Sequence, residues 1–168
     1  MPHPLVSQLR FTRSEFKRGL KGLEDESARV RLLPMNCISW SVGHLAWHEQ
    51  KYFLFYGQEV ILLPEVNELF AYKAAASTPA LDEMLAAWNT ITRAADPWLD
   101  TLTSETLQQH VLRNGKPGKY IWGSLLQRVI YHYWYHTGEN LAIRQMLGHK
   151  NLPEFVGNID GQAPYHPG

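Results

Sequence analysis

The chain has 168 residues, of which 45% are hydrophobic and 19% charged, with six Trp and eight Tyr, so its composition is that of a folded globular protein. Lys plus Arg and Asp plus Glu both total 16, which leaves no net positive charge to neutralise phosphates and excludes nucleic acid as the expected partner. This length predicts a single domain with a sizeable core.

The N-terminus and the cysteine content favour the cytoplasm. The first residues lack the basic start and apolar run of an export signal, and the single Cys37 cannot form an internal disulfide. The most apolar stretch, residues 120–135, is interrupted by Gln127, Arg128 and His132, and falls short of the ~20 apolar residues that a membrane span requires. We therefore expect a cytoplasmic protein without a membrane segment.

Helical periodicity predicts two long helices in the first third of the chain. The first covers residues 4–20, with Gly22 as a stop signal. The second runs from an N-cap at Asn36 to about Tyr56 and is apolar nearly all round. Its outer face must be covered by another segment or by a partner subunit, and we expect a homodimer.

Two further long helices are predicted, each after a long connection. Residues 58–79 form an ordered excursion over the bundle, and the third helix follows an N-cap at Thr78 and ends near Leu102. Residues 103–119 contain the turn signal Asn114-Gly115, whose flanks either pair as a ribbon or remain irregular. The fourth helix covers residues 121–147.

The remaining residues, 150–168, hold too much Pro and Gly for a helix, so we expect them to lie extended along the body. Four long helices without a convincing strand pattern predict an all-α fold. We expect an antiparallel four-helix bundle with long connections, in which inward side chains on facing helices build any cofactor site.

Two of these helices each contain a pair of histidines four residues apart: His44 and His48 on the second, His132 and His136 on the fourth. Side chains at this spacing lie on one face of a helix, about 6 Å apart along its axis, so both imidazoles can reach one ion. A metal that does chemistry typically takes three protein ligands and leaves a position open. Three histidines suit zinc, nickel or a similar divalent ion, with either His44 or His48 as the third. If all four bind, the site is closed and structural, or dinuclear.

The residues around both pairs resemble a known family. The pattern Trp40-Ser-Val-Gly-His-Leu-Ala-Trp-His-Glu49, followed downstream by Val129-Ile-Tyr-His-Tyr-Trp-Tyr-His-Thr-Gly-Glu139, is similar to that of the DinB/YfiT-like superfamily of bacterial metalloproteins. The resemblance implies that His44, His132 and His136 hold the metal, usually nickel or zinc, at one end of a four-helix bundle, and that His48 is an unmatched extra. Family members of known activity use a low-molecular-weight thiol such as mycothiol, bacillithiol or glutathione, which they transfer to an electrophile or use to isomerise maleylpyruvate.

Five further residues are candidates for the surroundings of the metal. Glu139 is a candidate to orient a ligand, bind metal or transfer protons, and His48 is a second candidate catalytic residue. Arg128 is a candidate to bind a carboxylate of the thiol, and Trp40 and Trp47 are candidate walls of a substrate pocket. Each has a structural alternative, as a solvated carboxylate, an ion-paired arginine or a core aromatic.

These expectations describe a metal-dependent enzyme that acts on a small electrophile with a low-molecular-weight thiol, of transferase or isomerase type. A metal-dependent hydrolase is the alternative enzyme. Two readings from other classes use the same histidines without turnover: a dimeric bundle that metal merely stabilises, and a stress-linked protein that binds a small ligand.

Overall fold

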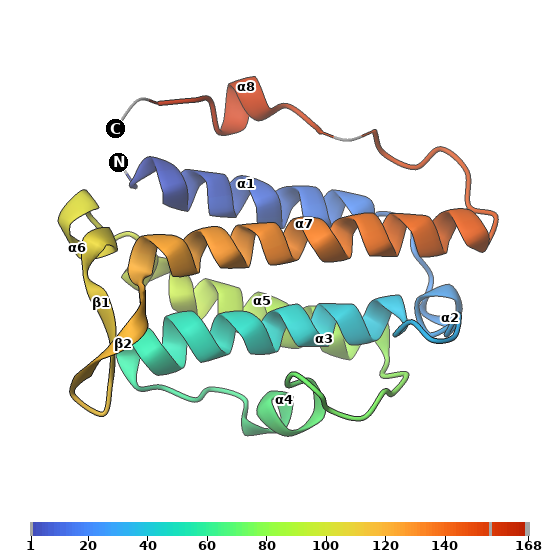
Figure 1. The fold of residues 1–168 in the computed structure, drawn as a ribbon. Helices are drawn as coiled ribbons and strands as arrows, with labels where there is room; N and C mark the ends of the chain where they lie inside the picture. The colour runs from blue at the N-terminus through green and yellow to red at the C-terminus, as the bar shows by residue number, and fades with distance from the viewer. Residues whose placement is uncertain (1, 155, 167–168) are drawn as a thin grey trace.

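The computed structural model describes residues 2–154 and 156–166, and within them the chain is mostly helical with one small two-stranded sheet (Figure 1). The helices are α1 (Pro4–Gly19), α2 (Asp25–Ala28), α3 (Ile38–Glu49), α4 (Pro64–Leu69), α5 (Leu81–Leu99), α6 (Ser104–Gln108), α7 (Trp122–Met146) and α8 (Ile159–Gln162). A π-helix, η1 (Gln50–Tyr56), continues α3, and the sheet pairs β1 (His110–Arg113) with β2 (Lys116–Ile121). No helix among the described residues is long and apolar enough to cross a membrane.

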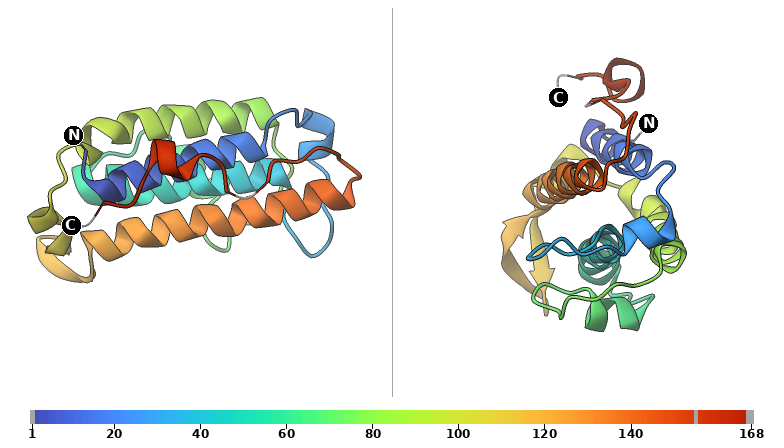
Figure 2. Two further views of the ribbon diagram at one scale, coloured as in Figure 1. Left: turned by 90° about the horizontal axis from the view of Figure 1, so that it is seen from above. Right: turned by 90° about the vertical axis from the view of Figure 1, so that its right-hand side faces the viewer.

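The four long helices α1, α3, α5 and α7 lie side by side (Figure 2). α1 packs mainly on α7 and α3 on α5, and α3 also contacts α7. Figure 1 shows that α1 and α7 run in one direction and α3 and α5 in the other. The packed pairs α1–α7 and α3–α5 are therefore parallel, and the expectation of antiparallel neighbours is wrong for them. The reason is that residues 57–80 carry the chain back along the molecule before α5 begins.

This returning connection covers the outer face of α3. Every side chain of α3 is buried, and α3 contacts α4 on the side away from the core helices. Gln50 holds the connection in place: its Oε1 accepts hydrogen bonds from the backbone N–H groups of Leu62 (3.0 Å) and Leu63 (2.8 Å), and its Nε2 donates to the Leu63 carbonyl (2.9 Å). Because the same chain covers this face, the apolar surface of α3 no longer argues for a homodimer.

Two local expectations, the cap of α5 and the fate of residues 103–119, need correction or completion. The cap of α5 is not Thr78: Ala80 is the N-cap residue, and the backbone N–H of Leu81 donates to the distant Asp25 carboxylate at 2.8 Å. Asn114 and Gly115 both have positive φ (52° and 72°), as a tight hairpin turn requires, so their flanks pair as the ribbon β1–β2.

The N-terminal cap of α3 and the C-terminal tail also differ from expectation. The N-cap of α3 is Cys37 rather than Asn36. The tail forms one helical turn, α8, which packs near α1, so the expectation that it holds no helix is wrong for those residues. Asn158 makes this turn feasible, because its side chain accepts a hydrogen bond from the Gly161 N–H and so caps the helix N-terminus.

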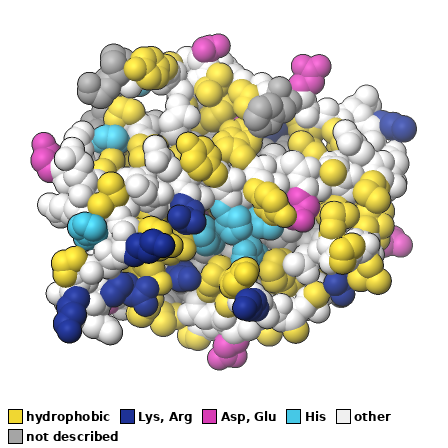
Figure 3. Space-filling view, in the orientation of Figure 1, with side chains coloured by type: hydrophobic (Ala, Val, Ile, Leu, Met, Phe, Trp, Pro, Cys, Tyr) yellow, Lys and Arg dark blue, Asp and Glu magenta, His cyan; other side chains and the backbone are white. Residues whose placement is uncertain are grey.

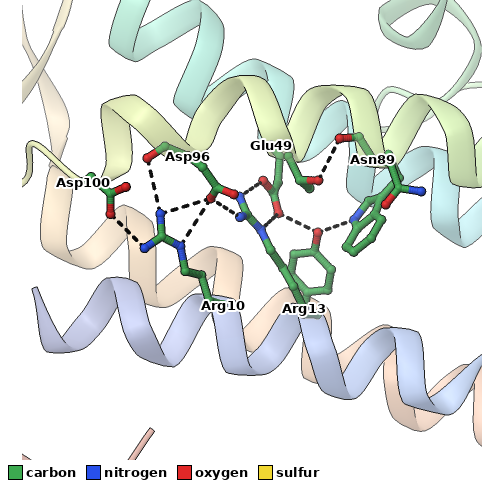
Figure 4. Close-up of polar contacts among 9 residues, drawn as sticks. Arg10, Arg13, Glu49, Asn89, Asp96 and Asp100 are labelled. Carbon is green, nitrogen blue, oxygen red and sulfur yellow. Dashed lines mark hydrogen bonds and ion pairs between the residues drawn. The ribbon is translucent and has the colours of Figure 1, made fainter. Parts of the chain in front are cut away.

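A buried polar network ties the long helices together (Figure 4). Arg13 of α1 donates from Nε to Glu49 Oε1 of α3 at 2.8 Å and from Nη1 to Asp96 of α5 at 2.7 Å, and a second contact joins its Nη2 to Glu49. Tyr133 of α7 donates to Glu49 at 2.6 Å and accepts from Trp88 Nε1 at 2.5 Å. Burial opposes the charge of Arg13, but the Glu49 carboxylate raises the pKa of this guanidinium above its ordinary value. The network therefore places an ion pair at the centre of the core.

Candidate metal centre

Three of the histidines converge between α3 and α7. His44, His132 and His136 each offer a ring nitrogen, and these atoms all lie within 4.8 Å of one another. The Nε2 atoms of His132 and His136 are 3.1 Å apart, and the His44 ring centroid lies 5.0 Å from that of His132. Two of the three side chains, His44 and His136, are only 7% exposed. The histidines of α7 thus face the one contributed by α3, at a separation that a single ion can span.

Two of the rings are fixed by acceptors on their outer nitrogen. His44 Nδ1 lies 2.7 Å from the Phe70 carbonyl, and His136 Nδ1 lies 2.8 Å from Glu139 Oε2. Because a carbonyl or carboxylate oxygen only accepts, each Nδ1 must hold the proton, which leaves the lone pair of Nε2 directed at the centre. Trp40 stacks on the other side of His44 at 4.9 Å between ring centroids. Glu139 therefore lies where a residue that orients a ligand is expected.

The protonation of the rings suits metal binding. Burial, with the charges of neighbouring histidines, lowers the pKa of His44 to about 4 and that of His132 to about 3. Both imidazoles are therefore neutral at pH 7, which is the form that binds a metal. His132 Nδ1 is buried without a hydrogen-bond partner among the described residues. Its Nε2 lies 3.1 Å from the Nε2 of His136. Three imidazole nitrogen donors fit zinc or nickel.

Gly43 permits the close packing behind His44. A Cβ at this position would lie 2.7 Å from Met84 Sδ and 2.9 Å from the Phe70 ring, so the sequence element Gly43-His44 has a steric basis. We expect Gly43→Ala to displace Phe70, loosen the hydrogen bond that orients His44, and weaken metal binding by about tenfold. Competition against a chelator of known affinity measures this effect. Gly138→Ala is the matched control, because nothing lies within 4 Å of its Cβ, and equal affinities in the two variants would contradict the prediction.

A cavity of about 640 Å³ opens beside the histidines. Its walls come from α3, η1, β2, α7 and the segment after α4, and they are His44, Trp47, His48, Lys51, Tyr52, Tyr72, Tyr120, Arg128, Tyr131 and His132. Figure 3 shows the histidine side chains gathered at the centre of this face of the molecule. This volume is in the range of small-molecule sites.

The structure places the other predicted site residues at different distances from this cavity. Trp47 and Arg128 line it, as does His48, whose ring centroid lies 4.3 Å from that of His132. His48 is not one of the three histidines whose ring nitrogens converge. Trp40 and Glu139 are not among the lining residues, since they contact His44 and His136 from behind.

Sequence reasoning missed four residues of the cavity wall: Lys51, Tyr52, Tyr72 and Tyr120. Lys51 and Tyr52 had a usable signal, because they follow His48 by three and four residues on one continuous helix, and the His48 and Tyr52 ring centroids are 4.5 Å apart. Tyr72 and Tyr120 had none, since they reach the cavity from the long connection and from the hairpin.

Fold and site together define a mostly helical protein with a candidate three-histidine metal centre at the wall of a small-molecule cavity. Comparison with protein-family models matches residues 8–139 to the DinB superfamily. Because this match covers most of the chain, the protein belongs to the DinB superfamily, which confirms the resemblance seen in the sequence. No curated protein matches the chain.

Proposed function

We propose that this single-domain protein, a four-helix bundle in architecture, is a divalent-metal-dependent enzyme that transfers a low-molecular-weight thiol to a small electrophile or isomerises a substrate with it. The observation that supports this proposal is the convergence of three histidine ring nitrogens at the wall of the cavity of about 640 Å³. His44, His132 and His136 would hold the ion, with nickel or zinc as the proposed metal. Bound there, the ion would favour the thiolate form of the thiol at neutral pH.

The residues around the histidines have separate roles in this proposal. Phe70 and Glu139 hold the rings of His44 and His136 in orientation through their contacts at 2.7 and 2.8 Å. His48 lines the cavity, and burial together with the charges of His132 and His44 lowers its pKa, so its imidazole is neutral. A base this weak would accept the proton only of a thiol whose own pKa the bound ion lowers.

The walls of the cavity complete the assignment. The Trp47 ring covers one side of the cavity, and Arg128 offers a planar guanidinium for a carboxylate of the thiol or the substrate. In the transfer reaction the thiol sulfur forms a bond to the electrophilic carbon, and the leaving group departs with the electron pair of the bond that breaks. The protein residues hold both reactants close together, which lowers the entropic cost of their encounter.

Two measurements test the proposal in order. Elemental analysis of the purified protein should find about one divalent ion per chain, as a site with three ligands predicts. With that metal loaded, glutathione, mycothiol and bacillithiol are then assayed against a chromogenic aryl chloride. Protein without stoichiometric metal would contradict the metal centre. Metal without turnover on any thiol would favour a bundle that the ion only stabilises.

A further inference from the structure

A group of positive side chains lies beside the histidine cavity. Lys51 and Arg128 line the cavity itself, and a second hollow of about 280 Å³ shares Lys51 and Tyr120 with it and is also lined by Arg113 and Lys119. Figure 3 shows Lys and Arg side chains gathered to one side of the histidines. We call Lys51, Arg113, Lys119 and Arg128 the cationic rim.

The cationic rim is not neutralised within the part of the chain that the structure describes. None of its four members forms an ion pair with a described carboxylate, whereas all three arginines of α1 do. Burial and the positive charge of Arg113 lower the pKa of Lys51, so the charges disfavour one another. In a chain whose net charge is zero, this local excess costs free energy that a bound anion would offset.

Aromatic rings hold the rim cations in place at the cavity edge. The Arg113 guanidinium lies 4.1 Å from the centroid of Tyr56, and that of Arg128 lies 4.9 Å from the centroid of Tyr120. Such contacts fix the planar groups while leaving their N–H donors free for a ligand. The rim is therefore ordered for binding and lacks a described acidic partner.

We propose that the two adjoining hollows bind a small organic anion, with its charged group against the cationic rim and the rest of the molecule facing the histidines. This inference rests on the proposed function, since it names the substrate class of the same site. The volumes of about 640 and 280 Å³ suit a small molecule rather than a macromolecule. The tyrosine and tryptophan rings along the wall favour a flat, unsaturated part next to the anionic group.

A matched pair of fluorescent probes tests this inference on the full-length protein. 1-Anilinonaphthalene-8-sulfonate has an anionic sulfonate, and N-phenyl-1-naphthylamine has the same ring system without it. We expect the double variant Arg113→Gln/Arg128→Gln to bind the sulfonate probe about tenfold more weakly and to change the affinity for the neutral probe by less than about twofold. Lys17→Gln, an exposed change on α1, should alter neither. Benzoate and phenyl phosphate are then added as competitors. The one that displaces the sulfonate probe shows whether the site prefers a carboxylate or a phosphate.

Two outcomes would overturn the inference. One is that the double variant binds the sulfonate probe with unchanged affinity. The other is that it loses affinity equally for both probes, which would mean that the rim only shapes an apolar pocket. Failure of both competitors to displace the probe would also count against it. Elemental analysis of the same variants separates this test from that of the metal centre. If a variant loses anion binding but retains the metal, the result bears on the cationic rim alone. If the protein lacks the metal but still binds the anion, only the proposed function is contradicted.

Discussion

Replacing His136 with alanine is expected to lower the metal content of the purified protein from about one ion per chain to less than about a tenth of that, with the helical fold retained. His136 contributes one of the three converging nitrogens, and its loss also leaves Glu139 without the N–H that it accepts. Two remaining nitrogens bind a divalent ion far more weakly than three. Elemental analysis gives the metal content, and far-ultraviolet circular dichroism shows whether the helices persist.

Two control variants sharpen this result. His166→Ala removes an exposed histidine of the tail and should leave the metal content unchanged. His48→Ala removes a buried histidine that contacts the His132 ring at 4.3 Å but lies outside the converging group, and the metal should stay. If His48→Ala loses the metal as completely as His136→Ala, the site has four ligands and the assignment of three is wrong.

The largest effect on stability is expected from Glu49→Ala. Glu49 is fully buried, and it accepts hydrogen bonds from Arg13 and Tyr133. Its removal leaves the buried Arg13 charge with only Asp96, so we expect the free energy of unfolding to fall by about 3–5 kcal/mol. Urea denaturation followed by circular dichroism measures the change.

The double variant Arg13→Met/Glu49→Leu separates the unpaired charge from the loss of packing. It removes both ions together, and we expect it to regain most of the lost stability, because well-packed apolar residues often replace a buried ion pair without cost. Glu68→Ala, at an exposed position on α4, serves as the surface control. A loss below about 1 kcal/mol in Glu49→Ala would show that the network contributes little.

The long helices could be predicted because their periodicity and stop signals are local. Gly148, with φ of 82°, lies just beyond α7 as expected for a helix end. Features that depend on distant residues could not be predicted in this way. The cap of α5 comes from Asp25, and the parallel packing of α3 with α5 depends on the course of residues 57–80. In the sequence, Arg13 resembles a residue on the exposed polar face of an amphipathic helix, and only the folded chain shows that it is buried against Glu49.

The candidate site likewise has a part that local sequence patterns predict and a part that depends on distant residues. The spacing of His132 and His136 fixes their relation, since a helix places them on one face, and the closeness of Glu139 follows from the same helix. Spacing alone left His44 and His48 equivalent, and the family pattern chose His44. The structure shows a physical difference, because the Phe70 carbonyl contacts the His44 ring, whereas His48 Nδ1 has no partner among the described residues. Phe70 belongs to a connection whose path no local pattern in the sequence describes.

The π-helix η1 has a consequence for how this cavity can change. An α-helix turns by about 100° per residue, so a side chain four residues further on has gone slightly past one full turn around the axis. In the wider turn of a π-helix, with its i→i+5 hydrogen bonds, four residues fall slightly short of one full turn. In this chain η1 begins at Gln50, between His48 and Tyr52, and the ring centroids lie 4.5 Å apart for His48 and Tyr52 and 5.4 Å apart for Tyr52 and Tyr56. Substituting one of these residues alters one side chain. Deleting a residue from the π-helix would instead rotate the whole wall relative to the histidines, so its register is set by chain length as much as by residue type.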